Sequence, residues 1–135
     1  MIRSARFPIL AAALLSGIAP PLAQAHHSFA MFDSTKSVTL TGVIERFEWT
    51  NPHAVMFLLA SPDASPPEAW SVELASPGNL KRAGWTRDSV KPGDKVALVI
   101  RPLHDGGRGG SFVSGVVLNT GAVLKNGQLQ ADPLH

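Results

Sequence analysis

Five histidines and no cysteine set the side-chain chemistry available to this sequence of 135 residues. The lack of cysteine excludes disulfides, thiolate metal sites, iron–sulfur clusters and cysteine nucleophiles. Two of the histidines, His26 and His27, directly follow Leu22-Ala23-Gln24-Ala25, which ends in the small-x-small pattern of a signal-peptidase site. Cleavage after Ala25 would therefore leave both imidazoles beside a newly formed α-amino group.

An α-amino group beside two imidazoles is a chelating set for a metal ion. The amine has an ordinary pKa of about 7.7–8.0, so it loses its proton to a metal at modest cost. His26 can chelate through its amine and ring Nδ1, whereas His27 can close a chelate through the amine and the intervening amide nitrogen. Both arrangements are nitrogen-rich and tetragonal, which favours Cu(II) over Ni(II) or Zn(II). The alternative is that both residues only tolerate the cleavage site and remain in solvent.

His53 and His104 lie in two separate loops between expected strands. In an OB-fold barrel, the loops after the first and fourth strands flank the ligand-binding face. We therefore predict a ligand-binding rim at Asn51, His53, His104 and Arg108, with His53 as a supporting metal ligand. The twelve residues from His26 to Ser37 span up to about 40 Å when extended, which permits this arrangement. The alternative for His53 is a strand cap that forms a structural hydrogen bond.

The first 25 residues have the pattern of a Sec-type signal peptide. Arg3 and Arg6 form a basic start, and residues 7–18 form a short apolar run. This run has about 12 residues, whereas a membrane-spanning helix needs about 20, so we predict export rather than anchoring. Without Arg3 and Arg6 the 12 basic residues fall to ten, which equals the ten acidic residues. A neutral body argues against nucleic-acid binding, and we predict a periplasmic protein with no membrane span after cleavage.

The mature chain reads as a series of strands with one helix. In the first strand the alternation of apolar residues changes phase at Gly42, which predicts a bulge there. The second strand is nearly all apolar, which predicts that both of its faces are covered. Ser76 as N-cap, Pro77 as first helical residue and Gly84 after the last turn predict one short helix. The expected strands span Val38–Trp49, Ala54–Ala60, Trp70–Leu74, Lys95–Ile100 and Ser111–Leu118, with a short edge strand at Ala122–Leu124.

This order of elements predicts an all-β fold with one short helix. Five strands, a long bent first strand and a helix between the third and fourth strands match a five-stranded OB-fold-like barrel. A small β-sandwich is the alternative, since the same strands could build it. We predict a signal peptide at 1–25, a single barrel domain at 26–124 and a mobile C-terminal tail at 125–135.

Several short motifs together resemble a family of small exported bacterial proteins, known only as a domain of unknown function. They are His26-His27-Ser28-Phe29, Trp49-Thr50-Asn51-Pro52-His53, Trp70-Ser71-Val72-Glu73-Leu74, Ser76-Pro77, Gly84-Trp85 and Gly93-Asp94. The resemblance covers most of Ala25 to Leu124, and it implies a small periplasmic β-domain without an assigned activity. A weaker fold-level similarity is to bacterial periplasmic OB-fold proteins that bind small ligands.

Two functions follow from these observations. The leading prediction is a non-enzymatic periplasmic protein that binds copper through His26 and His27, with His53 as supporting ligand. No nucleophile–base set can be named in the sequence, which argues against an enzyme. The alternative is a module without metal, whose rim at Asn51, His53, His104 and Arg108 contacts a small ligand or a periplasmic protein.

Overall fold

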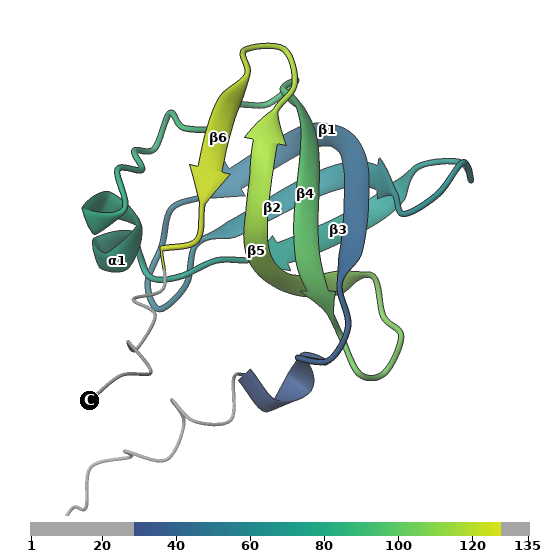
Figure 1. Ribbon diagram of the computed structural model, residues 1–135. Coiled ribbons are helices and arrows are strands. Elements are labelled where there is room, and N and C mark those ends of the chain that lie inside the picture. The colour runs from purple at the N-terminus through teal and green to yellow at the C-terminus, as the bar shows by residue number, and fades with distance from the viewer. Residues whose placement is uncertain (1–28, 128–135) are drawn as a thin grey trace, which may run out of the picture.

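Strands dominate residues 29–127, which are the part of the chain that the computed structural model describes (Figure 1). A 3-10 helix, η1, comes first, and a single short α-helix, α1, follows the third strand. In chain order the elements are η1 (Phe29–Met31), β1 (Val38–Glu48), β2 (Val55–Ser61), β3 (Glu68–Glu73), α1 (Pro77–Arg82), β4 (Lys95–Pro102), β5 (Gly109–Val117) and β6 (Ala122–Lys125).

The strands form one sheet that closes into a barrel. The sheet order is β3-β2-β1-β4-β5-β6, and a further parallel pairing joins β3 to β5. Three residue pairs make this closure, including Ser71 with Gly109 and Glu73 with Ser111. Five strands thus complete the barrel. The first residues of β5 pair with β3, and its later residues pair with β6 along the same edge. The prediction of an OB-fold-like barrel is confirmed, and the sandwich alternative is excluded because a single sheet closes on itself.

The barrel interior is filled by the inward-facing residues of each strand. In β2 the inward residues are fully buried, and their neighbours in sequence are only partly covered. The largest fully buried side chains, in order of volume, begin with Phe112, Leu40, Ile44, Met56 and Leu58. The prediction that β2 is covered on both faces is therefore wrong, because Leu59 on its outer face is 42% exposed.

β1 changes its inward face at a bulge, but not at the residue predicted. The register with β2 shifts between Ile44 and Arg46, so the extra residue is Glu45 rather than Gly42. Gly42 has a different role, because it allows β1 to approach the backbone of β2 closely. A Cβ atom there would lie 2.2 Å from the carbonyl oxygen of Leu59, so only glycine fits against β2 at this point.

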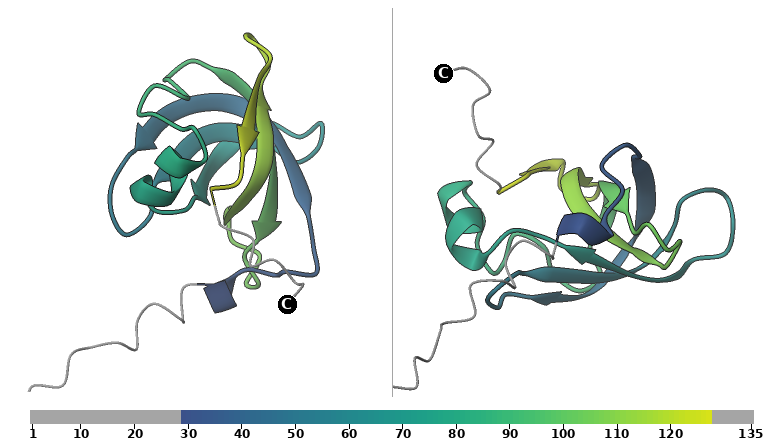
Figure 2. Two further views of the ribbon diagram at one scale, coloured as in Figure 1. Left: turned by 60° about the vertical axis from the view of Figure 1, so that its left-hand side comes forward. Right: turned by 90° about the horizontal axis from the view of Figure 1, so that it is seen from below.

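Helix α1 begins and ends where its sequence signals predict. The Ser76 hydroxyl accepts a hydrogen bond from the Asn79 amide at 3.3 Å, and Pro77 occupies the first turn. Gly84 follows the helix with a φ of 90°, a conformation in which glycine is favoured. Leu80 packs its side chain into the barrel core. Figure 2 shows that α1 and η1 lie on different sides of the barrel.

The last described residues pack back onto the barrel. The Trp85 indole Nε1 donates to the carbonyl of Lys125 at 2.8 Å, and the Asn126 amide donates to the carbonyl of Phe112. The predicted tail of residues 125–135 thus starts with residues that contact the core, and 128–135 lie outside the described residues. The predicted signal peptide, 1–25, also lies outside them.

Candidate functional site

A cavity lies on the outer face of β2 and β3, and we call it the outer-face cavity. Val55 and Phe57 face outward from β2, and their cross-strand partners on β3 are Glu73 and Ser71. The cavity has a volume of about 320 Å³. Among the described residues, the N-terminal segment and the chain around the loop after β4 also contribute to its lining, with Met31, Phe32, Leu103, Gly109 and Gly110.

His53 and Glu73 lie side by side at the β1–β2 loop. His53 precedes β2 in this loop, and Glu73 is the last residue of β3. The distance from His53 Nδ1 to Glu73 Oε1 is 2.7 Å, and the two side chains are 26% and 27% exposed. An Nδ1–H that donates to a carboxylate fixes the ring orientation and places the lone pair of the neutral imidazole on Nε2. Carboxylates orient metal-binding histidines in this way.

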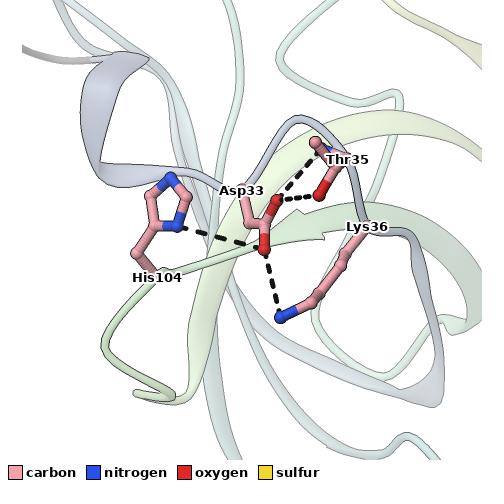
Figure 3. A network of polar contacts seen from close by, with 4 residues as sticks. All are labelled: Asp33, Thr35, Lys36 and His104. Atoms are coloured by element: carbon pink, nitrogen blue, oxygen red, sulfur yellow. Dashed lines mark hydrogen bonds and ion pairs between the residues drawn. The ribbon is translucent and has the colours of Figure 1, made fainter.

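Asp33 fixes the N-terminal segment beside the β4–β5 loop (Figure 3). Its carboxylate accepts hydrogen bonds from the Thr35 hydroxyl at 2.6 Å and the Thr35 amide at 3.0 Å. Lys36 Nζ lies 3.1 Å from this carboxylate, and His104 Nδ1 lies 3.9 Å from it. The hydrogen bonds from Thr35 and Lys36 lower the pKa of Asp33 to about 2, so the carboxylate remains charged.

Backbone contacts fix the same segment to the barrel. The amide of Asp33 donates to the carbonyl of Pro102 at 2.8 Å, and the amide of His104 donates to the carbonyl of Met31 at 2.9 Å. Phe32 forms an isolated β-bridge with Leu103. Residues 31–33 therefore have a defined position at the edge of the outer-face cavity.

Arg108 connects the β4–β5 loop to the start of β3. Its guanidinium donates two hydrogen bonds to the Glu68 carboxylate, one from Nε to Oε2 and one from Nη2 to Oε1 at 2.7 Å. Both side chains are about half exposed. The pair is bidentate, a geometry that adds orientation to a contact of modest energy. Asn51 is exposed in the β1–β2 loop, and its peptide bond to Pro52 is cis.

The predicted rim residues flank the outer-face cavity but do not meet at one centre. His53, His104 and Arg108 each contact a different carboxylate, on Glu73, Asp33 and Glu68 respectively. Within residues 29–127, no group of three or more histidine, aspartate or glutamate side chains is placed to hold a metal ion. His26 and His27 lie outside the described residues, so their proximity to His53 stays a prediction.

Sequence reasoning missed the cavity itself and the partner of His53. The apolar outer face of β2 was the available signal, because Val55 and Phe57 form part of a nearly all-apolar strand. Such a run predicts burial on both faces, although a partly covered apolar face is also typical of a binding site. Glu73 gave no local signal, since only the register of β2 with β3 brings it beside His53.

These features define a small closed β-barrel with a cavity on its β2–β3 face. By sequence, the chain belongs to a family of unknown function, DUF6152, whose model matches residues 13–112. No curated protein and no solved structure shows a significant match to the chain. In the part of the chain that the structure describes, no helix is long and apolar enough to cross a membrane.

Proposed function

We propose that the protein is exported to the periplasm, where it binds copper and performs no enzymatic reaction. His26 and His27 bind Cu(II) with the α-amino group that signal-peptide cleavage creates, and His53 supplies a further imidazole from the barrel. A site of this kind contains only nitrogen ligands. It therefore favours Cu(II) among the divalent metals of the first transition row.

The observation that carries this proposal is the position of the segment after the two histidines. The Met31 carbonyl accepts a hydrogen bond from the His104 backbone amide. Met31 also lines the same cavity as Glu73, which contacts His53. His27 precedes Met31 by four residues, which span at most about 14 Å. This short chain length permits the histidine pair to reach the cavity beside the His53–Glu73 pair.

The His53–Glu73 pair supports the choice of His53 over His104 as the supporting ligand. Glu73 Oε1 lies 2.7 Å from His53 Nδ1, whereas the corresponding distance from His104 to Asp33 is 3.9 Å. His53 is also the less exposed of the two, at 26% against 59% for the side chain. A histidine held by a carboxylate pays less orientation entropy when it binds a metal.

The test is a Cu(II) competition titration of protein that begins at His26, compared with protein that carries one additional N-terminal residue. We expect the extension to weaken binding by more than about tenfold and to change the EPR spectrum, since it removes the amine from the chelate. His53→Ala should weaken binding as well, and His104→Ala serves as the matched control that leaves it unchanged. An extension without effect on affinity or spectrum would show that the terminal-amine site is wrong.

A second candidate function is a ligand-binding module that needs no metal. The outer-face cavity favours it, because a concave and mostly apolar site with few polar groups is typical of small-ligand binding. The rim residues His53, His104 and Arg108 lie in the two loops beside this cavity. A chain that binds no copper but binds a small molecule there would favour this second function.

A further inference from the structure

We infer that a second cavity, on the α1 side of the barrel, binds a small aromatic carboxylate. This cavity lies between α1 and the connection that leads from α1 to β4 (Figure 1), and we call it the helix cavity. Its volume is about 580 Å³, and the described residues that line it differ from those that line the outer-face cavity. The inference therefore goes beyond both proposed functions and depends on neither of them.

Two cationic side chains line the helix cavity. Lys81 comes from the last turn of α1, and Arg87 comes from the connection to β4. Both residues are exposed, and within residues 29–127 neither side chain forms an ion pair or a hydrogen bond. Both positive charges are therefore available to a ligand.

The balance of charge indicates an anion with a single negative charge. Asp88 is the only acidic residue among the described residues that line the helix cavity, and it stands against Lys81 and Arg87. These three types of side chain are ionised at neutral pH, so one positive charge is in excess and no histidine is involved. A carboxylate balances this excess. A phosphate monoester carries about 1.5–2 negative charges and exceeds it, and an ammonium ion is repelled.

The floor of the helix cavity is aromatic. Trp49 and Trp85 line the cavity and are only 8% and 5% exposed. The Trp49 ring packs edge-on against Phe47, and the Trp85 ring packs edge-on against Phe112, each with 5.7 Å between ring centres. The hydrogen bond from Trp85 Nε1 to the Lys125 carbonyl fixes the second indole further. Rings that are already fixed lose little entropy when a ligand packs on them, and their faces and edges suit another aromatic ring.

Backbone hydrogen bonds fix the two segments that carry the cations. The Gly84 amide donates to the Lys81 carbonyl at 3.0 Å, which closes the end of α1. In the connection, the Thr86 amide donates to the Ser89 hydroxyl at 2.9 Å, and the Asp88 amide donates to the Thr86 hydroxyl at 3.2 Å. The Ser89 amide also donates to the Thr86 carbonyl at 3.1 Å. The helix cavity therefore has a defined frame before a ligand binds.

The experiment compares three probes that separate charge from aromatic contact: indole-3-acetate, indole-3-acetamide and acetate. A cavity of about 580 Å³ lies within the usual range for ligand pockets and accommodates a two-ring molecule. Each probe is titrated into ¹⁵N-labelled, metal-free protein at about pH 7 and low salt, while the indole N–H signals of the three tryptophans are followed by NMR.

The three tryptophans report the position of the bound probe. We expect indole-3-acetate to shift the indole signals of Trp49 and Trp85 and to leave that of Trp70 unchanged, because Trp70 lies on β3 and does not line the helix cavity. Indole-3-acetate should bind about tenfold more tightly than its amide, which has nearly the same shape but no charge. Acetate should shift none of the three signals, since it lacks the ring.

Four variants test the role of charge. Lys81→Gln and Arg87→Gln should each reduce the affinity for indole-3-acetate about threefold and leave the affinity for the amide unchanged. Asp88→Asn should raise the affinity for indole-3-acetate by a similar factor. Lys95→Gln is the matched control, because Lys95 is exposed on β4 and does not line the helix cavity. Backbone amide spectra of the unliganded variants establish that each one folds.

The possible results separate the site from the class of ligand. Equal affinities for the acid and the amide, or an acid affinity that neither Lys81→Gln nor Arg87→Gln lowers, overturn the carboxylate as ligand. If the signals of Trp49 and Trp85 do not shift, or if that of Trp70 shifts equally, the helix cavity is not the site. Either failure leaves the proposed copper site and the outer-face cavity unaffected.

Discussion

Replacing Gly42 by alanine tests the close approach of β1 to β2. A Cβ atom at Gly42 would lie 2.2 Å from the carbonyl oxygen of Leu59 and 2.7 Å from the Cα of Ala60. Non-bonded carbon atoms prefer separations of about 3.5–4.0 Å, so β1 and β2 would have to separate by roughly 1 Å. β1 cannot simply move away, because Gly42 also pairs with Val96 on β4.

The cost of Gly42→Ala follows from what obstructs the new methyl group. Overpacking a closely packed site costs about 1–3 kcal/mol, and the nearest atom here belongs to the backbone, which cannot rotate away. We therefore expect a loss of about 3 kcal/mol in the free energy of unfolding. For a domain of this size each kcal/mol corresponds to about 4–8 °C, so Tm should fall by roughly 12–24 °C.

Thermal and urea unfolding of the mature protein, followed by circular dichroism, measures this loss. Gly78→Ala is the matched control, because its Cβ would meet nothing closer than the Ser76 hydroxyl at 3.9 Å. Gly78 lies in α1, where alanine is favoured over glycine by up to about 1 kcal/mol, so the control should be neutral or stabilising. A Tm for Gly42→Ala within about 4 °C of the wild type would refute the close approach of β1 to β2.

Three further predictions concern titration, a hydrogen bond and the metal. Because the pKa of Asp33 is lowered to about 2, the stabilisation that its carboxylate provides is present above about pH 4 and is lost as the pH falls through 2. A carboxyl ¹³C NMR titration should show a midpoint at about pH 2, and Thr35→Ala should raise this midpoint. Trp85→Phe removes the 2.8 Å hydrogen bond to the Lys125 carbonyl and should cost about 1 kcal/mol in urea unfolding, whereas no loss would mean that the bond contributes nothing. Cu(II) affinity should fall as the pH drops below about 6.5, since protons compete for the imidazoles and the amine, and a pH-independent affinity would exclude these ligands.

The fold could be predicted to the extent that it depends on local sequence. Ser76, Pro77 and Gly84 mark the two ends of one helix, and the strands follow from apolar and alternating patterns within each segment, so these elements agree closely with the structure. The position of the bulge could not be read in the same way. Both Gly42 and Glu45 interrupt the alternation of β1, and only pairing with β2 decides between them.

The candidate site was predicted less completely, because its contacts are between distant parts of the chain. The loop positions of His53, His104 and Arg108 follow from the order of the strands, and the structure places all three in the expected loops. Their partners depend on register and on loop conformation. Glu73 reaches His53 through the β2–β3 pairing, and Glu68 reaches Arg108 across 40 residues of sequence.

The most direct test of the proposed copper site is a count of the imidazoles bound to Cu(II). Pulsed EPR of the mature protein with one equivalent of Cu(II) detects the remote nitrogen of each coordinated imidazole. We predict that His53→Ala removes one of these nitrogen signals, while His104→Ala leaves the spectrum unchanged. Identical spectra for the wild type and His53→Ala would contradict the account, because the copper would then be held without the barrel.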